Sequence, residues 1–136
     1  MRKYKKTLIF VGILAALALL YGLTYIPHTI VNIKPDKVSS IKIFDGNTGY
    51  ETEITDTAAI QYIINNLNEV TFQKDKWAFF YMGYSYRTTI YNHQGKPAKK
   101  LIINSSDTIR YKGFFYKAKG NQIDYEYIKK AVGKQP

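Results

Sequence analysis

The sequence predicts an α+β domain built on an antiparallel sheet and preceded by one N-terminal transmembrane helix. A long uncharged apolar run separates Lys6 from Lys34, and an isoleucine stripe with helical spacing follows at residues 60–67. Short segments rich in β-branched and aromatic residues, separated by turn signals, occupy the rest. Such strands pair antiparallel, so we expect the order β-β-α-β-β-β-β-α, with one main amphipathic helix packed on the sheet.

The apolar run is predicted to form a membrane anchor over residues 7–26. At about 1.5 Å per residue this helix would match a hydrocarbon core of about 30 Å. Tyr21 and Tyr25 lie at its far end, where aromatic rings favour the headgroup layer, and Pro27 ends the helix. A cleaved signal peptide is the alternative, but the A-x-A sequence at 16–18 lies inside the run. We therefore favour a retained anchor.

Charge sets the expected orientation, because cytoplasmic flanks carry an excess of Lys and Arg. The residues before the run include Arg2, Lys3, Lys5 and Lys6. We accordingly expect a single-pass protein of the cell membrane whose C-terminal part is extracytoplasmic. The expected parts are a cytoplasmic basic tail at 1–6, the anchor at 7–26, a linker at 27–37 and an extracytoplasmic α+β domain at 38–133.

Composition narrows the compartment and the partners. The 136 residues include no cysteine, so disulfides and thiolate chemistry are excluded, and a bacterial envelope with one membrane fits best. The net charge is +10, and the exported part stays basic although it holds all 10 acidic residues. A basic exported surface attracts anionic partners such as phospholipid headgroups or phosphate-rich wall polymers. Nucleic acid fits the charge but not the compartment, so none is expected.

The domain is expected to open with a hairpin and a helix. Ile41 and Ile43 alternate with polar residues as in a half-buried strand, and "DGNTG" at 45–49 is a turn before a second strand at 50–54. In the helix that follows, Ile60, Ile63, Ile64 and Leu67 form one apolar stripe. Asp56 or Thr55 is expected to cap its N-terminus.

The second half is predicted to be rich in strands. We expect a strand at 70–72, a polar bend at 73–76, a strand within 79–92, a turn at 92–97 and a strand at 99–104. A tight turn at Lys112-Gly113 would join strands at 108–111 and 114–118. A short helix with Asp124 as N-cap is expected to close the domain.

The sequence offers little support for catalysis. His28 and His93 read as solvated histidines, and no His or Cys spacing predicts a metal site. We therefore expect no enzyme activity, no cofactor and no metal. A paired-carboxylate hydrolase stays open, because the chain has acidic residues whose convergence in space the sequence does not reveal.

Interleaved aromatic and basic residues suggest a partner-binding face. The chain has 13 Tyr, and this side chain combines an apolar ring with a polar tip suited to interfaces. Two arginines here would grip carboxylate or phosphate with paired hydrogen bonds. The alternative is that these residues form the core and an ordinary sheet surface. The candidate residues are Tyr84, Tyr86, Arg87, Arg110, Tyr111, Lys112, Phe114 and Tyr116.

Four stretches carry a resemblance to known proteins: "IKIFDGNTG", "ITDTAAIQYIINNLN", "YMGYSYRTTIYNHQGK" and "LIINSSDTIRYKGFFYKAKGNQIDYEYI". They resemble uncharacterised small single-pass extracytoplasmic proteins of Gram-positive bacteria, a domain of unknown function, over about residues 36–132. The resemblance implies the anchor and the location. It implies no catalytic or binding residue.

These observations lead to one main hypothesis and two alternatives. The main hypothesis is a membrane-anchored, extracytoplasmic, non-catalytic binding domain for a protein, a peptide or an anionic envelope polymer, with self-protection against a membrane-active peptide as a specific version. The first alternative is a hydrolase of wall glycan or lipid headgroups, using convergent carboxylates or His93. The second is an accessory subunit of a membrane complex, for which Gly12 and Ala16 give a small-xxx-small spacing in the anchor.

Overall fold

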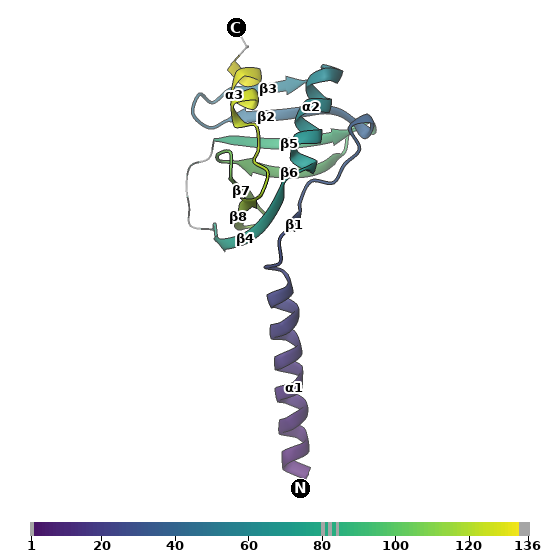
Figure 1. Ribbon diagram of the computed structural model, residues 1–136, viewed down its shortest axis with the longest axis vertical. Coiled ribbons are helices and arrows are strands. Elements are labelled where there is room, and N and C mark those ends of the chain that lie inside the picture. The colour runs from purple at the N-terminus through teal and green to yellow at the C-terminus, as the bar shows by residue number, and fades with distance from the viewer. Residues whose placement is uncertain (1, 80, 82, 84, 134–136) are drawn as a thin grey trace.

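The computed structural model describes residues 2–79, 81, 83 and 85–133. Helix α1 (Arg2–Leu23) extends away from an antiparallel sheet that carries two helices on one face (Figure 1). The predicted α+β class, the antiparallel sheet and the N-terminal apolar helix are thus confirmed.

Helix α1 extends away from the sheet, and only its C-terminal end contacts the described residues of the domain, through Lys74 of strand β4 (Thr71–Trp77). Its 22 residues would span about 33 Å, and none of them is buried. By length and composition the helix suffices to cross a membrane. It begins at Arg2 because the basic tail continues the same helix into the apolar run.

The residues expected to form a linker are part of the folded body. His28–Thr29 forms β1, which pairs with β4 (Thr71–Trp77), and Ile30 and Val31 are buried in the core. The Asn68 side chain then fixes the chain, because it accepts from the Ile33 backbone N–H at 3.1 Å and donates to its carbonyl at 2.7 Å. The folded body therefore begins at residue 28, before the expected boundary at 38. A short 3₁₀ turn, η1 (Pro35–Lys37), leads into the next strand.

Eight strands form one sheet in the order β1-β4-β8-β7-β6-β5-β2-β3. Every neighbouring pair is antiparallel. The remaining strands are β2 (Val38–Asp45), β3 (Glu51–Ile54), β5 (Tyr86–Asn92), β6 (Pro97–Ile103), β7 (Thr108–Tyr111) and β8 (Phe114–Lys119). This order places the β1–β4 edge next to α1 and β3 at the far edge (Figure 1).

Both predicted tight turns are present. Between β2 and β3 the Asp45 carboxylate accepts from the Asn47 N–H at 2.8 Å, and Gly49 has a φ of 79°. Between β7 and β8, Lys112 and Gly113 have φ angles of 49° and 83°, the left-handed pair that a two-residue hairpin turn requires.

The two helices pack on the sheet as the sequence patterns predict. The stripe of α2 (Thr57–Asn68) is buried, and the Asp56 carboxylate caps this helix by accepting from the Ala59 N–H at 3.0 Å. Helix α3 (Tyr125–Gly133) buries Ile128 and Val132. Its cap is Asp124, whose carboxylate accepts from the Tyr127 N–H at 3.1 Å.

The strand predicted within 79–92 is confirmed at Tyr86–Asn92. Two details of the predicted strands are wrong. Residues 73–76 form no bend, because pairing with β8 continues strand β4 to Trp77, with an irregular register after Lys74. Five strands rather than four lie between α2 and α3, and the short strand β1 precedes β2. The sequence did not reveal the full length of β4, because its last residues are exposed and stay in the strand through backbone pairing alone.

The sheet has two unlike faces. The inner face, which α2 and α3 cover, carries the main apolar core, including Ile41, Ile43, Ile90 and Ile103. The outer face carries the alternate residues of the same strands, which are more exposed and more polar.

Candidate functional site

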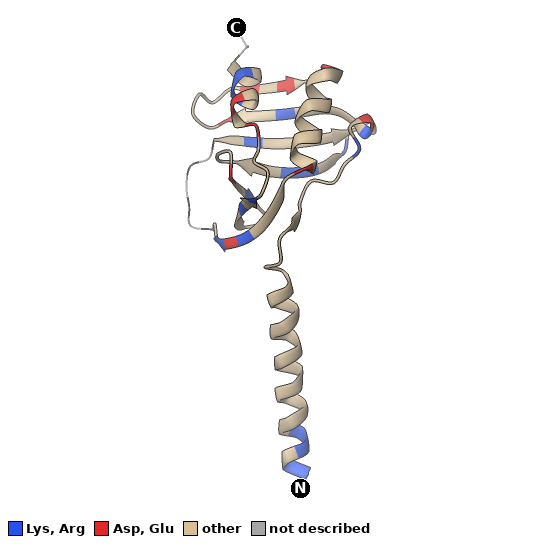
Figure 2. Cartoon of the chain, in the orientation of Figure 1, with Lys and Arg blue, Asp and Glu red and all other residues tan. Residues whose placement is uncertain are grey.

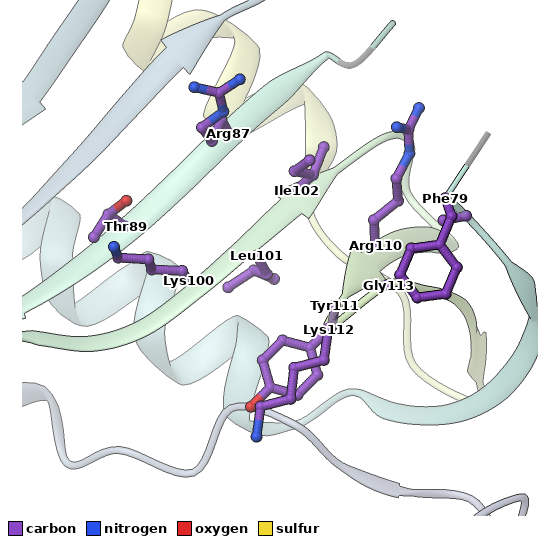
Figure 3. Close-up of a pocket in the computed structure, with 11 residues that line it drawn as sticks. Phe79, Arg87, Thr89, Lys100, Leu101, Ile102, Arg110, Tyr111, Lys112 and Gly113 are labelled. Atoms are coloured by element: carbon purple, nitrogen blue, oxygen red, sulfur yellow. The ribbon is translucent and has the colours of Figure 1, made fainter. Parts of the chain in front are cut away.

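The outer face contains a hollow of about 430 Å³. Strands β5, β6 and β7 form its floor, and its rim consists of Ala78 and Phe79, directly after β4, and of the β7–β8 turn (Figure 3). A space of this size falls within the range of small-ligand sites.

Strand register brings the hollow's side chains together. Arg87 and Thr89 alternate along β5, while Lys100 and Ile102 alternate along β6, so all four lie on one face. Across the sheet Arg87 is opposite Ile102, which is in turn opposite Arg110. At about 5 Å per strand the two arginine Cα atoms lie roughly 10 Å apart, with Ile102 between them.

The hollow is electropositive. Its lining includes Arg87, Lys100, Arg110 and Lys112, and none of its described lining residues is Asp or Glu. Figure 2 shows basic residues on the sheet strands and at the start of α1. Ile102 and the Phe79 ring supply apolar surface beside these cations. Cations around a partly apolar hollow favour a ligand with an anionic group and an apolar body.

Arg110 binds the backbone of two described residues that follow β4, Tyr81 and Gly83. Its Nη1 donates to the Tyr81 carbonyl at 3.0 Å, and its Nη2 donates to the Gly83 carbonyl. Its guanidinium also lies 5.1 Å from the Phe115 ring centre, on which the Tyr81 ring stacks edge-on at 5.0 Å. Backbone carbonyls therefore take two of the five N–H groups of Arg110, and its role in ligand binding stays a prediction.

Arg87 and Lys100 line the hollow from the neighbouring strands β5 and β6 (Figure 3). The Arg87 guanidinium stacks over the Phe44 ring at 5.5 Å, which limits its freedom without removing its charge. Both side chains are exposed, so an anion entering from solvent reaches them directly.

The rim depends on a glycine. A Cβ at Gly113 would lie 2.6 Å from two ring atoms of Phe79, and its φ of 83° is unfavourable for other residues. Close packing at this turn therefore places the Phe79 ring beside the hollow.

Tyr111 lies at the edge of the hollow, with its ring packed against the core. Its hydroxyl accepts a 3.2 Å hydrogen bond from Lys99 Nζ. Burial raises the pKa of Tyr111, but the Lys99 hydrogen bond and the charges of Lys99 and Lys112 outweigh it and leave that pKa below its ordinary value.

The other expected face residues do not join the hollow. Tyr86 is buried on the inner face, where burial and the neighbouring Tyr125 and Asp45 raise its pKa to about 12. Phe114 and Tyr116 also turn to the inner side, and burial raises the pKa of Tyr116. Tyr84 lies outside the described residues. The structure thus brings Arg87, Arg110, Tyr111 and Lys112 together and separates the remaining described candidates from them.

The groups considered for catalysis lie elsewhere. His93 Nε2 is 2.8 Å from the Asp36 carbonyl, at the opposite end of β5 from Arg87. Glu51 and Glu53 lie on the edge strand β3 and are exposed. Within residues 2–79, 81, 83 and 85–133, no three His, Cys, Asp or Glu side chains gather in a metal-binding cluster.

Sequence reasoning missed Phe79, Thr89, Lys100 and Ile102. Period-two alternation places Lys100 and Ile102 on one face of the predicted strand at 99–104, and this signal was available. The pairing of that strand with β5 was not, because it depends on the strand order.

Comparisons with known proteins assign this chain to no family. No family model, no curated protein and no solved structure matches this chain.

Proposed function

We propose that this chain is a membrane-anchored, extracytoplasmic binding domain that holds an anionic component of the cell envelope in the outer-face hollow. The carrying observation is the hollow itself, in which Arg87, Lys100 and Lys112 surround an apolar floor that has no carboxylate among its described lining residues. The unburied apolar helix α1 supports anchoring. The basic residues before it support an extracytoplasmic domain.

Phosphate-rich polymers are the ligand class that this chemistry favours. Guanidinium and ammonium groups on adjacent strands offer charge-assisted hydrogen bonds to successive phosphates. The backbone of such a polymer would lie along Ile102 and Thr89 between the cations.

The binding test uses the full chain in nanodiscs of phosphatidylcholine and a fluorescent glycerol-phosphate oligomer as probe. The hollow variant combines Arg87→Gln, Lys100→Gln and Lys112→Gln. The control combines Lys119→Gln, Lys129→Gln and Lys130→Gln, which remove the same charge from exposed positions elsewhere. Because charge-assisted hydrogen bonds contribute about 1.5–3 kcal/mol each, the hollow variant should bind at least about tenfold more weakly. Equal losses in both variants would show attraction by net charge alone and reject the site.

Orientation has a separate test, because the chain has no cysteine. A Tyr50→Cys variant places one thiol on an exposed hairpin, and a Lys3→Cys variant places one before the anchor. A membrane-impermeant maleimide added to intact cells should label position 50 and spare position 3. The reverse labelling would refute an extracytoplasmic domain.

A further inference from the structure

An exposed aromatic patch lies at the end of β4, beside the β7–β8 turn. Trp77 is 60% exposed and Phe79 is 66% exposed, which is unusual for two large rings in contact. Their ring centres are 6.0 Å apart, and each lies 6.4 Å from the Phe114 ring. We name Trp77, Phe79 and Phe114 the aromatic patch.

Contacts tie this patch to the end of α1. Lys74 Nζ donates to Thr24 Oγ1 at 3.1 Å and lies 4.3 Å from the Phe114 ring centre. The same ammonium is 5.4 Å from the ring centres of Tyr21 and Tyr25. One lysine thus joins the aromatic end of the helix to the aromatic patch of the domain.

A second hydrogen bond reinforces this link, since the Gln73 side chain donates from Nε2 to the Tyr25 backbone carbonyl at 3.1 Å. In a bilayer that α1 spans, Tyr21 and Tyr25 would lie in the headgroup layer. Lys74 would then lie at the same depth, and Trp77 is three residues further along the strand, about 10 Å away. Strand β4 descends toward the α1 end of the domain (Figure 1), so its last residues stay near that level.

We propose that the aromatic patch lies in the headgroup layer of the bilayer that α1 spans, so that the domain rests on the outer leaflet. This proposal rests on the anchoring role of α1 proposed above. Trp is the side chain that most favours this layer, because an apolar ring carries a polar N–H. Lys74, beside the Phe114 ring, and Lys112, next to Gly113 at the turn, complement lipid phosphates. Lys76 and Asp75 of the same strand carry opposite charges.

The same contact places the hollow beside the membrane. Phe79, Lys112 and Gly113 border the hollow, and Phe79 is also a member of the patch. A domain resting on its patch would therefore present the hollow to ligands at the outer surface of the bilayer. Membrane-linked anionic polymers meet that condition better than freely diffusing ones.

Trp77 fluorescence tests the proposal directly, because the chain has one Trp. The full chain is placed in phosphatidylglycerol–phosphatidylcholine vesicles with brominated acyl chains, and quenching is measured for bromolipid and for aqueous acrylamide. The control is Trp77→Phe combined with Tyr50→Trp, which moves the fluorophore to a residue that is 72% exposed near the far edge of the sheet. Bromolipid should quench Trp77 at least about threefold more than the control fluorophore, and acrylamide should quench it less.

Each other outcome overturns the proposal in a distinct way. Equal quenching of both fluorophores by bromolipid, in a chain that resists alkaline extraction, would reject the membrane contact and leave the anchor intact. Protection from acrylamide without bromolipid quenching would show that protein, such as a second copy, covers the patch. Extraction at alkaline pH would reject the anchor and the membrane contact together.

Discussion

The inner and outer faces of the sheet are made from the same strands, yet they differ in what they contact. Ile103 is fully buried against the core, whereas Ile102, the preceding residue on β6, forms the floor of an open hollow. Lys99 donates to Tyr111 at the edge of the core, whereas Lys100 extends into the hollow. Burial in the core accounts for the residues of the inner face, whereas the cations of the outer face contribute nothing to that core.

Helices cover only the inner face of the sheet, because that face carries the main apolar core. Helices α2 and α3 bury apolar side chains on the inner face, where burial contributes about 25 cal/mol per Å². On the outer face the segment after β4 covers Phe115 through Tyr81 and Arg110, so this part is closed without a helix. The hollow lies beside these contacts, over β5, β6 and β7.

The largest expected effect comes from two neighbouring isoleucines of β6. Ile103→Ala removes a fully buried side chain and should lower the free energy of unfolding by about 2–5 kcal/mol. Ile102→Ala, on the opposite face, should lower it by about 1 kcal/mol or less because its surroundings are partly open. Urea unfolding of the full chain in detergent micelles, followed by near-ultraviolet circular dichroism, measures both. Equal losses would mean that the faces are not energetically distinct.

The next largest effect is the loss of stability at alkaline pH, which we expect from the buried Tyr86 of the inner face and not from an exposed tyrosine. Tyr86 has a pKa of about 12 in the fold against 10.0 for an ordinary tyrosine, so the fold favours its protonated form. Its contribution is complete below pH 10 and is lost as pH rises toward about 12, which amounts to roughly 2 kcal/mol. Tyr86→Phe should flatten the fall of stability over this range.

The matched control is Tyr50→Phe, which removes the same hydroxyl from an exposed hairpin residue. Urea unfolding of both variants at a series of pH values from 9 to about 12 gives the two slopes. A Tyr86→Phe variant with the slope of the control would refute the role assigned to the buried hydroxyl.

The sequence predicts the inner face better than the outer one. The stripe from Ile60 to Leu67 and the Asp56 cap are local patterns, and a local pattern determines which side of a helix is buried. The hollow depends instead on β5 lying between β2 and β6, a pairing between distant segments that the pattern within one strand does not specify. Arg87 was expected from the aromatic and basic residues next to it in the sequence. Lys100 was missed because its place beside Arg87 depends on the pairing of β5 with β6.

The same distinction explains the error in the segment after α1. Ile30 and Val31 lie in the stretch 27–37 that was expected to be a linker, because two apolar residues between a long apolar helix and a polar stretch form no periodic pattern that would reveal their burial. Residues 73–76 lie beyond the short β1 partner, and Asp75 and Lys76 are exposed to solvent. Sequence patterns report burial, and an exposed part of a strand buries too little to be recognised.

A smaller loss of unfolding free energy is expected when the Asn68 side chain, which joins Ile33 to α2, is removed. Asn68→Ala leaves the N–H and carbonyl of Ile33 without their side-chain partner, which should cost about 1–2 kcal/mol in unfolding free energy. The control is Asn65→Ala on an exposed position of the same helix, where we expect little change. If both variants unfold alike, the segment after β1 is held by Ile30 and Val31 alone.

The smallest expected effect on stability concerns two neighbouring lysines of β6. Lys100→Gln should change the unfolding free energy by less than about 0.5 kcal/mol, because this side chain is exposed in the hollow. Lys99→Gln removes the hydrogen bond to Tyr111 and should lower stability by about 1 kcal/mol. The same two variants should behave in the opposite order when binding of the glycerol-phosphate probe is measured. A Lys100 variant that unfolds as easily as the Lys99 variant would mean that this cation maintains the fold, and the hollow would lose its strongest argument as a ligand site.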